Sequence, residues 1–381
     1  MELPFDRNRL DELMAQAGVD LVLATGKHTT KYLLGGYRYH FYAEMEAMGQ
    51  TRYLNAVGYP RGRPEDAFFV GLPGETPQLD REGIWTPHVR AEAASSVAVA
   101  TVAADAIESL GLGTGTVAVE LPFLPADTYG ELARRLPQAS LVDGVAVLEG
   151  LRAVKSPEEL TLLRQASELI VESMLAVIGG AEPGVTTREV AERLRAEEVA
   201  RGLGFDYCLV ATAGGFYRAP SDDRWEPGTS ISLDSGGKCR GYLGDLARMA
   251  VMGEPTQLMR ELLAEVDAVQ LAARRPIRPG ADGTEIFAAA HAELAGLPHR
   301  EQTVFEAHGM GLVSHECPHL HPDAPSPLEP GMVISIETTM KNPEVGFVKL
   351  EDTVVVTDDG WEAYGDTARG WNVAGAVPAA R

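Results

Sequence analysis

One pattern occurs twice in the second half of this chain and constrains its fold more than any other feature. The segment EPGTSISLD at 226–234 is matched about 100 residues later by EPGMVISIE at 329–337. Both contain Glu-Pro-Gly and Ile-Ser, and both end on conservative exchanges of Leu for Ile and Asp for Glu. A repeat at this spacing predicts two related half-domains.

Each copy of the repeat continues in the same way. The chain turns through a glycine and reaches a second acid in the next apolar segment, through Gly241 to Asp245 and through Gly346 to Glu351. We therefore expect each half to be a helix pair followed by a β-hairpin, with the two halves facing each other.

These acids carry the chemical argument. Asp234 and Glu337 end apolar strands, and Asp245 and Glu351 lie on the returning strands. Because neighbouring strands lie about 4.8 Å apart, each hairpin is expected to hold two carboxylates side by side. Four negative charges in an apolar setting are very costly unless protons or cations neutralise them. The pattern therefore predicts a site for divalent metal ions.

The segment EAHGMGLVSHE at 306–316 supplies a further ligand. His308 lies next to Gly309, where a missing side chain lets backbone and ligand approach closely. Four carboxylates and one imidazole suit a pair of first-row divalent ions, for which we expect Mn²⁺ or Co²⁺, with Zn²⁺ or Fe²⁺ also compatible.

Helix signals divide the chain near residue 150. Ser156 is a suitable N-cap, Pro157 suits the first helical position and Glu159 completes a capping box, so a long helix is predicted to run to Gly179–Gly180. A second helix, capped by Thr186, opens in PGVTTRE, and PGADGTE at 279–285 is its echo in the second half.

The first 150 residues alternate short apolar runs with helical stretches. Strands are expected at 20–25, 67–72 and 115–121, which is typical of a small α/β domain. We predict an N-terminal α/β domain at 1–150 and a catalytic domain at 151–381, and the fold class is α/β (α+β).

Composition excludes several kinds of partner. A formal net charge of -22 disfavours binding to nucleic acid or to an anionic membrane. The sequence contains no apolar run of about 18 residues, so no membrane span is predicted. We recognise no targeting signal and therefore expect a cytoplasmic location. The three cysteines show no spacing typical of a disulfide framework or a thiolate metal site.

The spacing of the acids resembles that of a known family. Asp234 and Asp245 are followed by HGMGL at 308–312 and then by Glu337 and Glu351. This pattern is similar to metallopeptidase family M24, which includes methionine aminopeptidase, prolidase and aminopeptidase P and has the pita-bread fold. With its added N-terminal domain, the chain looks most similar to the Xaa-Pro peptidase and creatinase branch.

The resemblance implies roles for individual residues. Asp234 would bind one metal ion, Asp245 and Glu351 would bridge two, and His308 and Glu337 would complete the second site. A metal-bridging hydroxide would attack the scissile carbonyl. Glu337 would relay the proton, and His315, the second histidine of the HGMGLVSHE segment, would help to stabilise the tetrahedral intermediate.

The chain departs from the family pattern around the substrate. A histidine usual about 17 residues before the first Asp is missing, and Tyr217 or Arg218 stands there. Lys349 replaces an arginine common two residues before the last Glu, and a lysine cannot form the bidentate fork of an arginine. Arg218 either recognises a substrate carboxylate or is structural. His40 is a candidate for reaching a neighbouring site across a homodimer.

Three functions remain compatible with these residues. The leading hypothesis is a metal-dependent peptidase acting on small Xaa-Pro peptides. The second is a small-molecule amide or amidine hydrolase or lyase, similar to ectoine hydrolase or creatinase, on the same metal cage. The third is a non-catalytic binding protein that has kept the fold.

Overall fold

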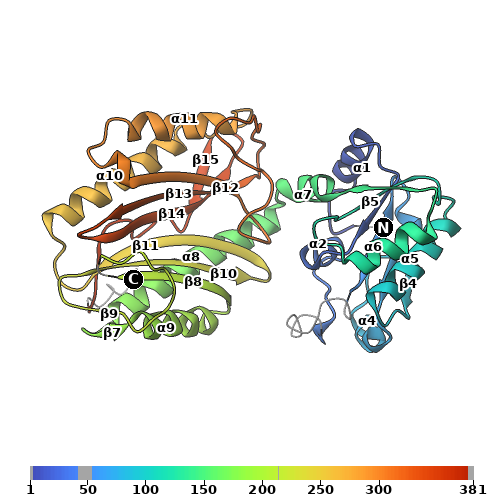
Figure 1. Ribbon diagram of the computed structural model, residues 1–381, viewed down its shortest axis with the longest axis horizontal. Coiled ribbons are helices and arrows are strands. Elements are labelled where there is room, and N and C mark those ends of the chain that lie inside the picture. The colour runs from blue at the N-terminus through green and yellow to red at the C-terminus, as the bar shows by residue number, and fades with distance from the viewer. Residues whose placement is uncertain (1–2, 42–53, 213, 376–381) are drawn as a thin grey trace. The chain divides into compact units, whose positions relative to one another are not determined.

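The chain folds into two compact units. The computed structural model describes residues 3–41, 54–212 and 214–375. The units comprise Met1–Leu151 and Arg152–Arg381 (Figure 1). Within the described ranges, no helix has the length and apolar character needed to cross a membrane.

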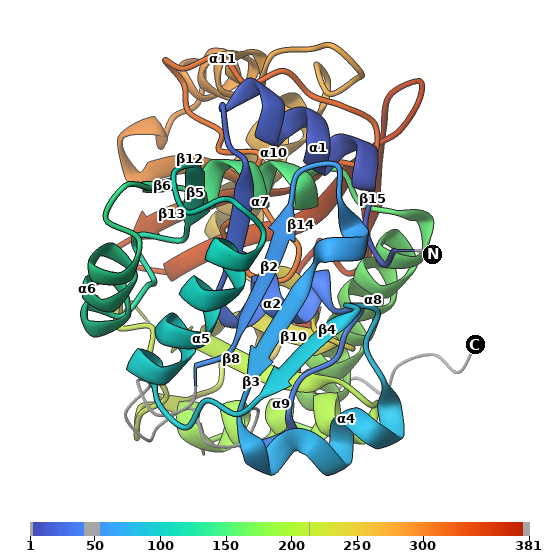
Figure 2. The same ribbon diagram turned by 90° about the vertical axis from the view of Figure 1, so that its right-hand side faces the viewer.

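The N-terminal unit is built on one mixed sheet. Its strand order is β4-β3-β2-β1-β5-β6, with antiparallel pairs β1–β2 and β2–β3 and parallel pairs elsewhere. Figure 2 shows β2, β3 and β4 next to one another. The strands are β1 (Leu21–Ala24), β2 (Ala56–Pro60), β3 (Phe68–Gly71), β4 (His88–Ala91), β5 (Thr116–Val119) and β6 (Ser140–Asp143).

Helices cover both faces of this sheet. The helices are α1 (Arg7–Gln16), α2 (Lys27–Leu33), α4 (Thr76–Glu82), α5 (Ser96–Ser109), α6 (Ala126–Arg135) and α7 (Val145–Ala153), with short 3-10 helices at Pro64–Asp66 and Pro73–Glu75. One apolar cluster joins α1, α2 and α7 to one face, and a second joins α5 and α6 to the other. The predicted α/β fold of this region is confirmed.

The C-terminal unit contains two similar runs of elements. The first run is α8 (Pro157–Gly179), α9 (Thr187–Ala200), β8 (Gly204–Thr212), β10 (Ser230–Cys239) and β11 (Tyr242–Val251). The second is α10 (Gln257–Arg274), α11 (Gly283–Leu294), β12 (Thr303–Gly309), β13 (Val333–Asn342) and β14 (Gly346–Val356). Short elements complete the unit: β7 (Val185–Thr186), β9 (Arg224–Trp225), a 3-10 helix (Arg300–Gln302), β15 (Trp361–Tyr364) and β16 (Asn372–Val373).

The order of strands in the larger sheet shows the pseudo-symmetry directly. It runs β12-β13-β14-β11-β10-β8, so the two halves meet where β14 pairs with β11. The predicted helix pair and hairpin are present in each half, but each half also adds an unpredicted strand, β8 or β12. The hairpins are joined edge to edge in one sheet, whereas we expected two halves that face each other.

Local signals begin the helices where the sequence predicted. The hydroxyl of Ser156 accepts from the backbone N–H of Glu159, and the Glu159 carboxylate accepts from the backbone N–H of Ser156 at 2.7 Å. Thr186 and Asp282 cap α9 and α11 with the same reciprocal pattern. The repeated helix openers are therefore confirmed in both halves.

Glycine makes both hairpin turns possible. Gly241 has a φ of 101° and Gly346 a φ of 93°, in the left-handed region that other residues rarely adopt. Both stand between a hairpin's two acids in the sequence, so the turn that brings the returning strand back depends on each of them.

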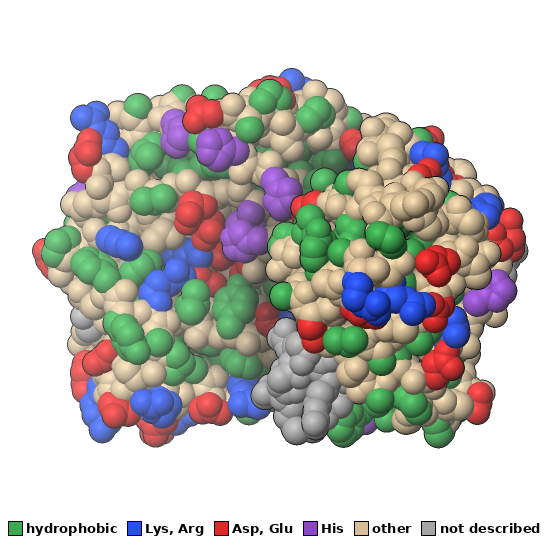
Figure 3. Space-filling view, turned by 45° about the vertical axis from the view of Figure 1, so that its right-hand side comes forward, with side chains coloured by type: hydrophobic (Ala, Val, Ile, Leu, Met, Phe, Trp, Pro, Cys, Tyr) green, Lys and Arg blue, Asp and Glu red, His purple; other side chains and the backbone are tan. Residues whose placement is uncertain are grey.

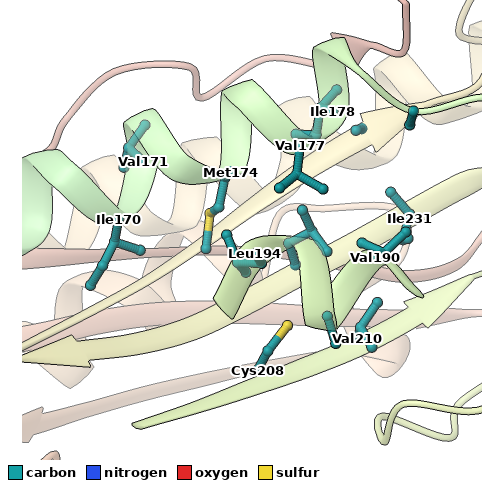
Figure 4. Close-up of a cluster of buried hydrophobic side chains, with 14 of the residues drawn as sticks. Ile170, Val171, Met174, Val177, Ile178, Val190, Leu194, Cys208, Val210 and Ile231 are labelled. Atoms are coloured by element: carbon teal, nitrogen blue, oxygen red, sulfur yellow. The ribbon is translucent and has the colours of Figure 1, made fainter. Parts of the chain in front are cut away.

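One face of the larger sheet is closed by the helices. Figure 4 shows Ile170, Met174 and Val177 of α8 and Leu194 of α9 packed toward Val210 and Ile231 of the sheet. Matching clusters join α10 and α11 to β12, β13 and β14. Because the helices take one face, the other face is left for a site.

Candidate metal centre

A row of paired residues crosses the larger sheet and carries three of the predicted ligands. Asp234 pairs with Ala247, Ala247 with Glu351, Glu351 with Glu337, and Glu337 with Glu306. Since directly paired residues of antiparallel strands project to the same face, these acids share one side of the sheet. The repeat thus brings acids from both halves into one line.

The remaining predicted ligands lie two residues along the same strands. Asp245 precedes Ala247 on β11, and His308 follows Glu306 on β12. Side chains two residues apart on a strand point to the same face, so both join the row. Asp245, His308 and Glu351 offer ligand atoms that all lie within 4.8 Å of one another, a group able to hold a metal ion.

These side chains open onto a cavity of about 450 Å³. Figure 3 shows histidine, acidic and basic side chains close together on the face of the C-terminal unit. The volume falls within the range of small-ligand sites, roughly 300–1,000 Å³. The lining residues are Tyr207, Leu209, Arg218, Asp234, Asp245, Val304, Glu306, His308, Ser314, His315, Glu337, Thr339, Lys341, Phe347, Lys349 and Glu351.

Burial disfavours the charged form of these carboxylates. Asp234, Asp245 and Glu351 are each no more than 3% exposed. Burial, and next the charge of Glu351, raise the pKa values of Asp234 and Asp245, the latter strongly. The same causes raise the pKa of Glu337 to about 7. Carboxylates in such a setting favour protons or cations.

Two basic side chains already lie against these carboxylates. The Lys349 ammonium forms ion pairs with Asp234 at 2.6 Å, with Glu351 at 2.9 Å and with Glu337. Arg218 also pairs with Asp234. Burial alone would raise the pKa of Glu351, but Lys349 and His308 outweigh it and hold that pKa below its usual range.

The two histidines of the HGMGLVSHE segment stack on each other. Their ring centroids lie 3.9 Å apart with planes 14° from parallel. His308 Nε2 lies 3.9 Å from Glu337 and 3.8 Å from Glu351, within the row. Burial, and then the neighbouring His308, lower the pKa of His315, so a neutral ring is favoured there.

The donor set fits a divalent ion. Carboxylate oxygens and an imidazole nitrogen are the ligands that first-row divalent metals accept. Glu351 Oε1 accepts a hydrogen bond from Ser335 at 2.7 Å. Glu351 Oε2 is also buried, and it lies 2.9 Å from the Lys349 ammonium. Buried carboxylate oxygens such as these are stabilised by cations, so the acids and His308 together fit a divalent ion.

Tyr207 is a site residue that the sequence reasoning missed. Tyr207 pairs with Gly236, which pairs in turn with Asp245, and the Tyr207 hydroxyl donates across the glycine to the Asp245 carboxylate. A Cβ at position 236 would lie 2.4 Å from the tyrosine ring. The Gly236–Gly237 pair in the strand was the available signal, because glycine in a strand often marks a close approach.

The candidate substrate-binding residues lie in different places. Arg218 and Lys349 line the cavity, whereas Tyr217 is 65% exposed and is absent from the lining. His40 belongs to the N-terminal unit, is exposed, and its backbone N–H donates to Gln78 at 2.9 Å. Its role across a dimer stays a prediction.

Lys341 and Phe347 also line the cavity and were not singled out from the sequence. The Lys341 ammonium lies 5.4 Å from the centroid of the Phe347 ring, and the Arg218 guanidinium lies 5.1 Å from it. Both cations therefore meet one aromatic ring at the cavity. The period-2 pattern from Glu337 through Thr339 to Lys341 was the signal that places Lys341 on this face.

Comparison with known proteins adds independent observations. The model for metallopeptidase family M24 matches residues 161–358, and the model for the creatinase/prolidase N-terminal domain matches residues 7–154. An Xaa-Pro dipeptidase of Pyrococcus furiosus is 30% identical over 231 residues, covering 58% of this chain and 66% of that protein. An Xaa-Pro dipeptidase of Pyrococcus horikoshii is 29% identical over 278 residues, covering 70% and 76%.

A solved structure shares the overall architecture. The structure of an Xaa-Pro dipeptidase from Bacillus anthracis matches with a TM-score of 0.81 at 23% identity, covering 96% of this chain and 98% of that one. At this level of identity the likeness concerns the fold. The predicted pita-bread fold with an N-terminal α/β domain is confirmed.

Proposed function

This chain belongs to metallopeptidase family M24, as the spacing of its acids predicted, and we propose that it is a metal-dependent Xaa-Pro dipeptidase. The observation that carries the proposal is the row of carboxylates on the open face of the larger sheet, in which Asp234, Asp245 and Glu351 are buried. We propose as its metal ligands Asp234, Asp245, His308, Glu337 and Glu351.

Divalent ions held there would lower the pKa of a water molecule and polarise the scissile carbonyl. The side chains of the chain perform the other tasks. Glu337 faces the cavity, and burial together with the charge of Glu351 raises its pKa to about 7. A carboxylate that lines the cavity among the proposed metal ligands can take up the proton of a metal-held water, so we assign Glu337 the proton relay.

We assign His315 to the stabilisation of charge on the substrate carbonyl oxygen. Its ring lines the cavity beside His308, and its Nδ1 lies 3.1 Å from the Ser314 hydroxyl. A neutral imidazole carries one N–H, and a donor aimed at a developing oxyanion stabilises the transition state.

The cavity is suited to the carboxylate of a short peptide. Arg218 and Lys341 flank the Phe347 ring, so positive charge and an apolar surface adjoin each other. A dipeptide with a C-terminal proline presents a carboxylate and an apolar ring together. This match favours a dipeptide over a longer peptide as substrate.

Other properties complete the proposal. We propose Mn²⁺ or Co²⁺ as the working ion because mixed oxygen and nitrogen ligands suit both. We retain the division into an N-terminal domain at 1–150 and a catalytic domain at 151–381. A cytoplasmic location, a homodimer, and substrate roles for Tyr217 and His40 remain predictions.

A panel of peptides tests the function. Metal-free protein is loaded with Mn²⁺ or Co²⁺ and assayed for release of the free N-terminal amino acid from Xaa-Pro dipeptides, from the same dipeptides as C-terminal amides, and from tripeptides that begin with Xaa-Pro. Cleavage that favours the free dipeptide is expected. Failure of the fully loaded protein to release the N-terminal amino acid from any of these peptides would contradict the proposal.

A further inference from the structure

Lys349 is the most unusual feature of the site, because its ammonium lies among the proposed metal ligands. Its Nζ is 2.6 Å from Asp234 and 2.9 Å from Glu351, and it also pairs with Glu337. The residue is 4% exposed. Three carboxylates from three strands, β10, β13 and β14, thus converge on one cation.

The two carboxylate oxygens of Glu351 face different parts of the site. Oε1 accepts from Ser335 at 2.7 Å and lies 3.8 Å from His308 Nε2, whereas Oε2 lies 2.9 Å from Lys349. The group of Asp245, His308 and Glu351 has its ligand atoms within 4.8 Å of one another. Asp234 and Glu337 lie outside that group and both pair with Lys349. One part of the site is therefore shaped for an ion, and the other part already holds a cation.

Charge supports the same division. Four buried or half-buried carboxylates face two basic side chains, Lys349 and Arg218, and both of these pair with Asp234. One divalent ion beside Asp245 would balance the charge that remains. A second ion beside Asp234 would have to approach oxygens within roughly 2.0–2.2 Å, in the space that the ammonium fills. Like charges at such a separation repel strongly.

We propose that the ammonium of Lys349 competes with the second metal ion, so that the chain binds its two ions in separate steps. The first ion enters the group of Asp245, His308 and Glu351 while Lys349 stays in place. The second ion binds near Asp234 only when Lys349 leaves those carboxylates. Lys349 is thus a positioning residue that sets metal occupancy, and this inference rests on the proposed metal site.

Metal titration tests the inference without an activity assay. Metal-free protein is titrated with Mn²⁺, and bound and free ion are separated by the electron paramagnetic resonance signal of free Mn²⁺. The wild-type chain is expected to bind one ion at least about tenfold more tightly than the second. Lys349→Met removes the charge at similar length, and is expected to tighten the second site by about tenfold or more while the first changes less.

Lys341→Met is the matched control. Lys341 is a second lysine of the same cavity, and its ammonium lies beside the Phe347 ring. It carries the same charge at the same cavity, so a general effect of removing a positive charge from the cavity would appear in both variants. The stepwise affinities of the Lys341 variant are expected to remain within about twofold of the wild type.

The outcomes separate the two proposals. If the wild type binds two ions with equal affinity, or if Lys349→Met leaves the second affinity unchanged, the competition is refuted and the metal site stands. If neither wild type nor variant binds any ion, the proposed function itself fails. Thermal unfolding with and without Mn²⁺ checks that the variant is folded, and equal affinities of the wild type for its two ions would refute the competition even if it is not.

Discussion

Glu337 and Glu351 stand directly opposite each other as register partners on β13 and β14. The corresponding acids of the first half are offset, because Asp234 faces Ala247 and Asp245 faces Gly236. The expectation of two carboxylates side by side therefore holds directly for one hairpin and diagonally for the other. The offset leaves space over Gly236, which the Tyr207 ring takes.

The opposed pair leads to the first prediction. Glu337→Gln keeps the shape of the side chain but removes a negative charge and the proposed proton relay. We expect peptidase activity to fall by about 10²–10⁴-fold. Metal affinity is expected to fall as well, and metal analysis after dialysis against a fixed level of free Mn²⁺ measures it.

Glu306→Gln supplies the control for that substitution. Glu306 is the direct partner of Glu337 on β12 and lines the same cavity, but it is exposed and is not a proposed ligand. Its metal content should match that of the wild type. An equal loss of metal in both variants would show that overall negative charge, and not ligation, governs binding.

His315 should be separable from the metal ligands. His315→Ala removes the proposed donor to the carbonyl oxygen while leaving all five proposed ligands in place. We expect kcat to fall by about 10²–10³-fold with metal content unchanged. His308→Ala is expected to lower both kcat and metal content. Loss of metal from the His315 variant would reassign that histidine to ligation or to support of the His308 ring.

Gly236 should be needed for the contact between Tyr207 and Asp245. In Gly236→Ala the new Cβ meets the tyrosine ring, so the ring must shift and the hydrogen bond to Asp245 is lost. We expect a stability loss of about 1–3 kcal/mol. Metal affinity should fall by roughly tenfold, as for other lost partners of a ligand.

A double-mutant cycle with Tyr207→Phe isolates that contact. The phenylalanine lacks the hydroxyl, so adding Gly236→Ala in this background should lower metal affinity little further. Stability should still fall, because the ring and the new Cβ continue to clash. Additive losses of metal affinity in the double variant would refute the link between the glycine and Asp245.

The buried carboxyl of Glu198 is expected to make the unfolding free energy depend on pH, independently of catalysis. It is fully buried on α9, where Ser235 donates to it at 2.8 Å, and burial raises its pKa to about 7. The folded chain therefore keeps a proton that the unfolded chain releases near its ordinary pKa. Between about pH 4.5 and 7 the folded state binds more protons, so the unfolding free energy falls as pH rises, by at most about 1.4 kcal/mol per pH unit.

Glu198→Gln removes this proton and should remove the associated slope. The unfolding free energy of the variant relative to the wild type should rise between pH 5 and pH 8, as measured by urea unfolding at each pH. Glu192→Gln, an exposed position on the same helix, is the control and should follow the wild type. If the unfolding free energies of all three proteins change with pH in parallel, the raised pKa of Glu198 is contradicted.

Much of the fold could be predicted because it depends on local signals. Helices α8, α9 and α11 are capped by Ser156, Thr186 and Asp282. These caps act within three residues along the chain, so the local sequence is enough to indicate them. The duplicated acids predicted two related halves, since equivalent positions of a repeat occupy equivalent places in the structure. The strands β8 and β12 escaped prediction because nothing in the repeat segments themselves specifies a third strand in each half.

The cation contacts of the site could not be read from the sequence. Lys349 was noted only as a replacement for arginine, yet its ammonium lies among three carboxylates. Which acids it meets depends on the pairing of Ala247 with Glu351, a contact between the two halves. Tyr207 likewise reaches Asp245 only through the register of β8, β10 and β11. Such long-range register is not specified by local pattern.

Anomalous diffraction from crystals grown with Mn²⁺ tests the central claim most directly. Data collected on either side of the manganese absorption edge locate the ions independently of any assumed ligand. We predict a strong peak bounded by Asp245, His308 and Glu351, with a second, weaker peak beside Asp234 at higher Mn²⁺ concentration. If crystals grown at saturating Mn²⁺ show no anomalous peak along this row of acids, the account is contradicted.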